Sequence, residues 1–128
     1  MKILLDTRIL LLAAAMPEKL PEAATRMLEN TANDLVFSAA SLWEIAIKSS
    51  LRHSELHVDG AELRRGLLQR GYRELNVTGP HALAAANLPL LHRDPFDRML
   101  VAQATVESMV LLTADKVVGR YPGPIELV

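Results

Sequence analysis

The chain has no cysteine, few aromatic residues and no long apolar segment, and each scarcity excludes a class of structure or chemistry. Without cysteine there are no disulfides and no thiolate ligands, so any metal site must use oxygen or imidazole. Aromatic residues make up only 4% of the chain, so the core must be built from aliphatic side chains. The apolar run at residues 9–15 is much shorter than the roughly 20 residues of a membrane-spanning helix. We therefore expect a cytoplasmic protein that does not enter a membrane.

Positive and negative charges nearly balance, with a formal net charge of −1 at pH 7. No global positive field attracts a polyanion, so any binding of nucleic acid has to depend on local basic patches. A length of 128 residues is typical of one domain, because two independent cores of half that size would be too small to be stable. We predict a single domain over residues 1–128.

Short apolar runs alternate along the chain with segments of helical periodicity. The predicted strands are residues 3–5, 35–37, 72–77, 109–112 and 125–128, and the predicted helices are residues 20–28, 39–50, 59–70, 79–87 and 93–107. The connections are too short for long antiparallel excursions. This order therefore predicts an α/β fold with a mainly parallel sheet covered by helices on both faces.

Acidic residues stand where several of these elements begin or end. Asp6 and Asp115 each follow a predicted strand, Asp94 and Asp97 open a helix, and Glu44 lies two turns into another. The carboxyl ends of parallel strands meet at one edge of a sheet, so these acids can converge there. Because clustered carboxylates repel one another, a divalent cation is their natural companion, and oxygen ligands favour Mg²⁺ or Mn²⁺.

Each acid also has a purely structural explanation. Asp94 can cap a helix that has Pro95 as its first residue, and Asp97 favours the positive end of the helix dipole. Glu44 can pair with Lys48 on a solvated face, and the acids that follow strands can close turns. Spacing alone leaves the metal site and these separate explanations evenly balanced.

Four segments, taken in order, resemble the signature segments of PIN-domain toxins of the VapC type. They read ILLDT, SAASLWEIAIKS, HRDPFDRMLVAQA and LLTAD, and together they span residues 3–115. The resemblance implies a three-layer α/β/α sandwich and a ribonuclease that depends on Mg²⁺ or Mn²⁺. It also implies that Asp6, Glu44 and Asp97 hold the ion, with Asp115 as the fourth acid and Asp94 in a supporting role.

From this resemblance we predict hydrolysis of an RNA phosphodiester by in-line attack of a metal-bound water. Asp115 would bind a second ion or orient the water. Thr7, Ser41 and Thr113 would hold the acids in place by hydrogen bonds. Several cationic residues near the site in sequence are candidates for positioning RNA: Arg8, Lys48, Arg52, Arg93 and Arg98.

The chain departs from the family pattern directly after the first acid. Arg8, Leu11 and Leu12 stand where relatives often have His and then a Leu-Trp pair. Metal binding is unaffected by this change, which bears instead on how RNA lies near Arg8. The family also implies two protein partners, a VapB-type antitoxin whose C-terminal segment lies across the acidic pocket, and a second copy of the chain.

The sequence lacks residues that two other classes of α/β protein require. A receiver domain needs adjacent acids after the first strand, and a haloacid-dehalogenase-type phosphatase needs a second Asp two residues after the first, where Arg8 stands. A PIN nuclease that processes RNA outside a toxin role remains open, as does a non-catalytic interaction module. We predict Trp43 and Phe96 to be core residues rather than platforms for bases, and His53 and His57 to be surface residues.

Overall fold

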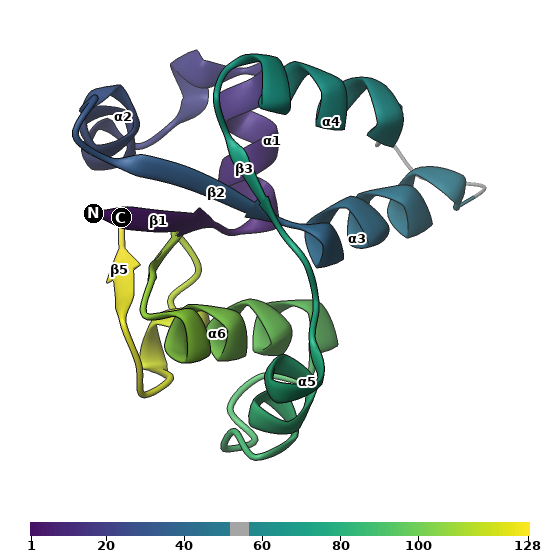
Figure 1. Cartoon of the computed structure of the whole chain (residues 1–128), viewed down its shortest axis with the longest axis vertical. Coiled ribbons are helices and arrows are strands. Elements are labelled where there is room, and N and C mark those ends of the chain that lie inside the picture. The colour runs from purple at the N-terminus through teal and green to yellow at the C-terminus, as the bar shows by residue number, and fades with distance from the viewer. Residues whose placement is uncertain (52–56) are drawn as a thin grey trace.

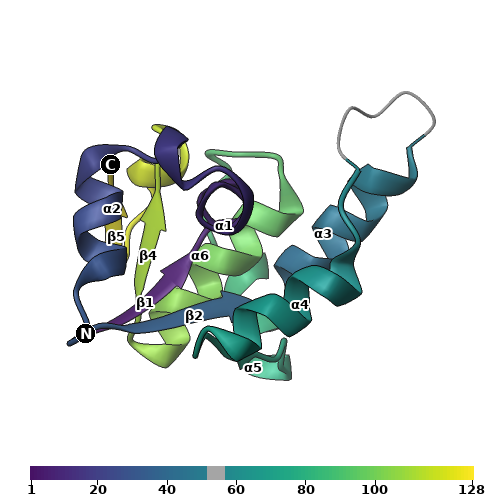
Figure 2. The ribbon, with the colours of Figure 1, turned by 90° about the horizontal axis from the view of Figure 1, so that it is seen from above.

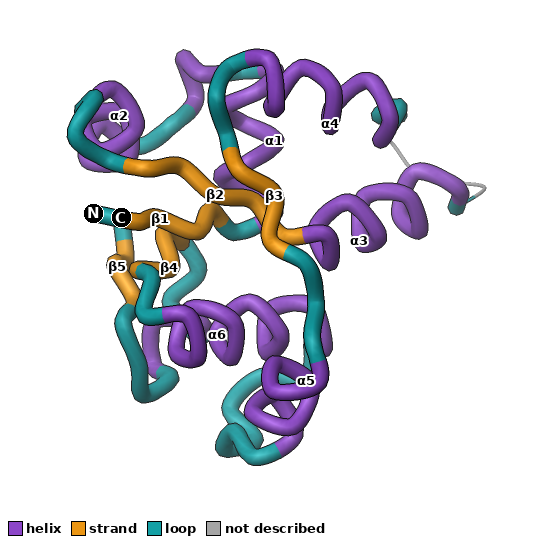
Figure 3. The backbone as a smooth tube through the Cα atoms, viewed as in Figure 1, coloured by secondary structure: helices purple, strands orange, loops and turns teal. Residues whose placement is uncertain are grey.

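The sheet has five parallel strands in the order β3-β2-β1-β4-β5. The computed structural model describes residues 1–51 and 57–128. The strands are β1 (Lys2–Leu5), β2 (Asp34–Ser38), β3 (Arg73–Leu75), β4 (Val110–Thr113) and β5 (Ile125–Leu127). Figure 3 shows them at the centre of the molecule, between helices on both sides. The predicted parallel sheet is confirmed, and with it the three-layer α/β/α arrangement.

Helices cover both faces of the sheet. One face carries α1 (Thr7–Ala15), α2 (Glu22–Glu29) and α4 (Gly60–Gln69), and the other carries α5 (Gly79–Ala86) and α6 (Pro95–Glu107) (Figure 1). Two short 3₁₀ turns lie at Pro17–Lys19 and Val118–Arg120. Helix α3 (Ala39–Ser50) continues directly from β2, and Figure 2 shows α3 and α4 extending together beyond the end of the sheet.

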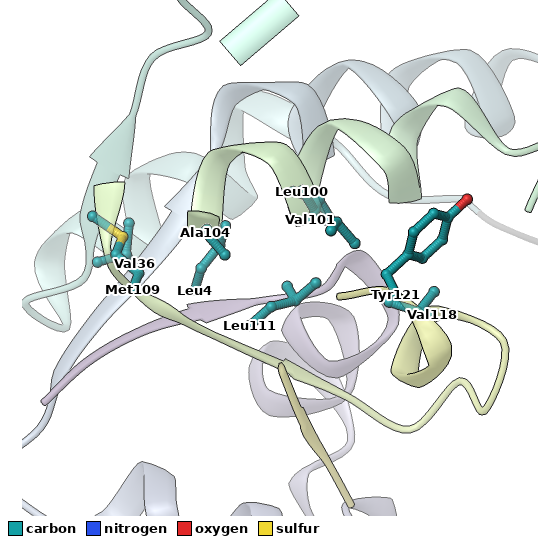
Figure 4. Packing of buried hydrophobic residues seen from close by; sticks show 9 residues of the cluster. All are labelled: Leu4, Val36, Leu100, Val101, Ala104, Met109, Leu111, Val118 and Tyr121. Carbon is teal, nitrogen blue, oxygen red and sulfur yellow. The ribbon is translucent and has the colours of Figure 1, made fainter. Parts of the chain in front are cut away.

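The alternation of side chains along β1 divides the core into two parts. Leu4 packs on the α6 side, where it meets Leu111 of β4, whereas its neighbours Ile3 and Leu5 pack on the α1 side. Successive side chains of a strand point to opposite faces, so a continuous apolar run is what a strand buried on both faces requires. Figure 4 shows the first of these clusters, with Leu100 and Val101 of α6 directed at the strands.

The segment after β1 forms a helix that the sequence analysis did not predict. Residues 9–15 contain only Ile, Leu and Ala, so no alternation of polar and apolar residues marks a helical face. Asp6 caps this helix, α1, by accepting a hydrogen bond from the backbone N–H of Ile9 at 2.7 Å. Ile9 and Leu10 are fully buried against the sheet. Packing of α1 against the sheet therefore explains the apolar run at residues 9–15.

Two of the residues named from the sequence, Arg52 and His53, lie outside the described residues. His57 is exposed, as predicted. Within residues 1–51 and 57–128, every helix is too short or too polar to cross a bilayer.

Candidate metal centre

A cavity of about 460 Å³ opens at the carboxyl edge of the sheet, beyond the ends of β1 and β4. Five carboxylates from four segments of the chain line it, together with three basic side chains. The acids are Asp6, Glu44, Asp94, Asp97 and Asp115, and the bases are Arg8, Lys48 and His92. The structure thus brings together all the acids that the sequence placed at element ends, because parallel strands present their carboxyl ends to one edge.

Asp6 is fixed by hydrogen bonds to both of its carboxylate oxygens. Oδ1 accepts the N–H of Ile9, and Oδ2 accepts the hydroxyl of Thr113 at the end of β4. The residue is only 6% exposed. Burial raises the pKa of Asp6 above its ordinary value, these two hydrogen bonds lower it, and the carboxylates of Asp115 and Glu44 raise it further. Burial, the largest of these causes, outweighs the two hydrogen bonds.

Glu44 is buried on the inner side of α3 and is only half satisfied. Its Oε2 accepts a hydrogen bond from Lys48, so the predicted pair exists. The residue is 4% exposed, and the prediction of a solvated face is therefore wrong for Glu44. Its Oε1 is buried without a hydrogen-bond partner among the described residues. A buried carboxylate oxygen left in this state is costly unless a cation approaches it.

The N-terminus of α6 supplies two more acids with different tasks. Asp94 caps the helix by accepting the N–H groups of Phe96 at 2.8 Å and Asp97 at 3.4 Å, as its structural explanation predicted. Asp97, one turn into α6, has no such donor to its carboxylate from the helix. Burial, followed by the charge of Asp94, raises the pKa of Asp97 to about 7. Half of the Asp97 side chains are thus protonated near neutral pH when no cation is bound.

His92 is a member of this site that the sequence analysis missed. Its Nε2 lies 3.2 Å from Oδ2 of Asp97 and 3.6 Å from Oδ2 of Asp115. These three side chains could be read as a ligand set for a metal ion. However, Nδ1 of His92 accepts the N–H of Asp94 at 3.1 Å, so a neutral ring carries its proton on Nε2. The ring is therefore arranged to donate to the two carboxylates rather than to bind a metal.

The polar residues predicted to support the acids fall into two groups. Thr113 donates to Asp6, whereas the hydroxyl of Thr7 donates to Ser41 at 2.9 Å. The latter two hydroxyls join α1 to α3 instead of contacting an acid. Both residues are buried where those helices meet.

Of the four described cationic residues predicted to position RNA, two line the cavity and two do not. Arg8 and Lys48 line the cavity. Arg93 is exposed and does not line it. Arg98 donates to the backbone oxygens of Ala85, Leu88 and Pro89, so its guanidinium fastens the segment after α5. Its hydrogen-bonding capacity serves the fold.

The prediction that Trp43 is a core residue is wrong, since the residue is 65% exposed. Phe96 is partly buried, and the two rings meet edge to face with centroids 5.4 Å apart and planes at 75°. Trp43 lies on α3 one residue before Glu44, and burying Glu44 turns Trp43 toward the side of the helix. The exposure of Trp43 thus follows from the burial of Glu44 on the neighbouring side of α3.

The residues present fit a divalent cation of the Mg²⁺ or Mn²⁺ kind. Oxygen donors without thiolates suit these ions. The unpartnered Oε1 of Glu44 and the raised pKa values of Asp6 and Asp97 all indicate that negative charge exceeds the positive charge available nearby. Asp6, Glu44 and Asp97 line the same cavity. Among the described residues, the ligand atoms that lie within 4.8 Å of one another are those of His92, Asp97 and Asp115.

Comparison with known proteins agrees with the fold. A family model for the PIN domain matches residues 3–124. No curated protein sequence matches the chain at a significant level. Among solved structures, VapBC2 from Rickettsia felis bound to a promoter DNA fragment superposes with a TM-score of 0.74 at 19% identity, covering 100% of this chain and 99% of that one. DNA-bound VapBC from Salmonella typhimurium gives 0.65 at 21% identity, with coverage of 98% and 97%. VapBC-1 from nontypeable Haemophilus influenzae gives 0.61 at 20% identity, with coverage of 99% and 98%.

Proposed function

Since the chain belongs to the PIN-domain family, whose members are nucleases, we propose that it is a metal-dependent endoribonuclease and the toxin of a VapBC-type toxin-antitoxin pair. The observation that carries the proposal is the convergence of five carboxylates on one cavity, with Oε1 of Glu44 buried and unpartnered. The likeness to VapBC structures supports the toxin assignment through the fold. One PIN domain over residues 1–128, acting in the cytoplasm, completes the proposal.

In this proposal Asp6, Glu44 and Asp97 hold Mg²⁺ or Mn²⁺. When bound, the cation supplies Lewis acidity that activates water and neutralises charge on the phosphate. Thr113 keeps Asp6 oriented through the hydrogen bond to Oδ2. Such outer contacts fix the direction in which a ligand's remaining lone pairs point.

The other polar residues of the cavity act on the RNA or on the acids. His92 donates its Nε2 proton toward Asp97 and Asp115, which limits their mutual repulsion. Asp115 orients the water or holds a second ion. Arg8 and Lys48 lie at the cavity and attract the phosphates on either side of the bond that is cut.

The test is cleavage of total RNA by the purified protein in Mn²⁺, compared with Asp6→Asn and Asp97→Asn. Asparagine keeps the helix cap at Asp6 and a hydrogen-bond acceptor at both sites, so folding is preserved. Asp34→Asn, at an exposed position on β2, is the matched control. We expect both site variants to lose cutting by roughly a hundredfold or more, with the control unchanged. Cutting at the parental rate by both site variants would end the proposal.

The toxin role has its own test. Induced expression of the parental chain should arrest growth, and Asp97→Asn should not. Co-expression of any small DNA-binding protein encoded beside the chain should relieve the arrest and form a complex with the chain. A homodimer, which we propose from the family resemblance, is measured by sedimentation. RNA cleavage without growth arrest or a neutralising partner would favour an RNA-processing role for the same site.

A further inference from the structure

An apolar groove of about 420 Å³ lies beside the acidic cavity, between α3 and α6. Trp43 forms one wall, and Phe96 and Met99 form the other. Val77, in the segment between β3 and α5, also contributes to the lining. The lining side chains are apolar except for the indole N–H of Trp43, so the groove is suited to a flat, weakly polar ligand.

The burial of Glu44 accounts for the position of Trp43 at the surface of α3, where the indole is left largely uncovered. A tryptophan can bury 150–250 Å² of surface, roughly, when it packs in a core, yet this one is 65% exposed. Phe96 meets the indole edge to face, a geometry in which one ring supports the other and leaves a face of the indole free. The tryptophan is thus held in place but left uncovered.

The groove and the acidic cavity share the same two helix turns. Trp43 directly precedes Glu44, and Phe96 directly precedes Asp97. The apolar lining and the acidic lining therefore meet along α3 and at the start of α6, which places the groove next to the cavity in which the phosphate would meet the acids. Arg8 and Lys48 add positive charge at the cavity for the neighbouring phosphates.

We propose that this groove, the Trp43–Phe96 subsite, binds one unpaired nucleobase next to the phosphate that is cut, by stacking it on the indole of Trp43. The inference rests on the proposed ribonuclease function and adds the form of its substrate. Every base has a π face, so stacking tolerates all four bases and favours purines. A base held in a duplex cannot enter the groove, and the substrate is therefore single-stranded.

A protein bound in the groove would contact more of α3 than a nucleobase would. Ile47 and Leu51 follow Trp43 at intervals of four residues and are 38% and 58% exposed. A partner helix or a second copy of the chain would cover this whole stripe. A nucleobase needs only Trp43 and the α6 wall, since neither Ile47 nor Leu51 lines the groove. Ile47→Ala therefore separates the two kinds of occupant.

The experiment uses the fact that Trp43 is the single tryptophan of the chain. A short single-stranded RNA, labelled for anisotropy, is titrated into the full chain with Ca²⁺ in place of Mn²⁺, and the RNA is checked for integrity afterwards. We expect saturable quenching of the Trp43 fluorescence with the same Kd as the anisotropy. A series of RNAs, each with a single abasic site at a different position, is then tested in the same way. Only the RNA whose abasic site falls at the groove should fail to quench the fluorescence.

Variants measure the contribution of the ring. Trp43→Ala should weaken RNA binding by roughly five- to a hundredfold, the range for loss of one stacked base. Trp43→Phe should restore most of it, and Ile47→Ala should leave it unchanged. Affinity for Mn²⁺ should be equal in all of them. Because Trp43 is largely exposed, Trp43→Ala is expected to fold.

Two results overturn the subsite while the ribonuclease stands. One is that RNA binds to the parental chain and is cut without changing the fluorescence of Trp43, while Trp43→Ala binds the RNA with the parental affinity. The other is an emission shift that grows with protein concentration without RNA and disappears in Ile47→Ala, which would mean that a second copy covers the groove. Absence of both RNA binding and Mn²⁺-dependent cutting in the parental chain is a failure of the proposed function itself.

Discussion

Replacing Asp97 by Asn should make the metal-free protein more stable above neutral pH. The pKa of Asp97 is raised from 3.8 to about 7, with burial as the main cause and Asp94 next. A folded pKa above the unfolded one means that the folded state prefers the neutral form. The ionised carboxylate therefore destabilises the fold as pH rises through the window from 3.8 to about 7, and this cost is absent below the window.

The magnitude follows from the same values. A difference between 3.8 and about 7 corresponds to roughly 4 kcal/mol of preference for the neutral form. The Asp97 side chain is 19% exposed, and relaxation around it reduces the cost, so we expect a gain of about 1–3 kcal/mol in the free energy of unfolding of Asp97→Asn. Asparagine keeps an oxygen near Nε2 of His92, which lies 3.2 Å from Oδ2 of Asp97.

The assay is urea unfolding at about pH 8 and about pH 5, with a chelator and with excess Mn²⁺. In chelator at the higher pH the variant should exceed the parental chain, and at the lower pH the difference should shrink. Excess Mn²⁺ should stabilise the parental chain by about 2.7 kcal/mol at a hundredfold excess over Kd, and the variant by much less. Asp34→Asn should behave as the parental chain throughout. A destabilised Asp97→Asn in chelator at the higher pH would refute the reasoning.

Three further predictions follow from contacts in and near the cavity. Affinity for Mn²⁺, measured by calorimetry, should rise about tenfold per pH unit below 7, as a proton leaves Asp97, and level off above it; an affinity that is flat with pH would contradict this. Thr113→Val removes the hydroxyl bonded to Asp6, so the pKa of Asp6 should rise further and Mn²⁺ affinity should fall by roughly tenfold or more. Arg98→Met removes the guanidinium donor to the backbone oxygen of Leu88 and one of the donors to those of Ala85 and Pro89, which also accept backbone N–H groups. This loss should cost about 1–3 kcal/mol in urea unfolding, and RNA affinity of the folded variant should be unchanged; a weakened RNA affinity would show that Arg98 also contacts the substrate.

The sheet and most helices could be predicted from the sequence because their signals are local. A buried run such as residues 3–5, and a cap such as Asp94 before Pro95, carry their structural meaning within a few residues. Helix α1 was missed because residues 9–15 are all apolar, and without polar residues among them no helical period can be recognised.

Much of the acidic site was predictable for a related reason. Asp6 and Asp115 follow strands, and parallel strands end at one edge of the sheet, so position along the chain implied position in space. His92 was missed because its role depends on where its ring lies. The hydroxyl of Tyr121 accepts the N–H of His92 at 2.8 Å, and this contact between distant segments leaves no mark in the spacing of residues. The quoted segment HRDPFDR, which begins with this histidine, was the available signal.

Trp43 and Arg98 show the limit of judging a residue by its type. Apolar bulk favours the core for Trp43, but the helix face was already committed to Glu44. A cation near the acids suggested contact with RNA for Arg98, but its guanidinium donates instead to backbone oxygens at the end of α5 and just after it. In both cases the competing demand came from a neighbour in space.

The way in which Asp6 is held has a consequence for synthesis of the chain. One of its oxygens is bound locally, at Ile9, while the other depends on Thr113, and the Asp6 N–H itself donates to Leu112 at 3.0 Å. A polypeptide emerging from the ribosome therefore lacks the completed centre until β4 has been translated and docked beside β1. A fragment that ends before Thr113 lacks one of the two side-chain hydrogen bonds that orient Asp6.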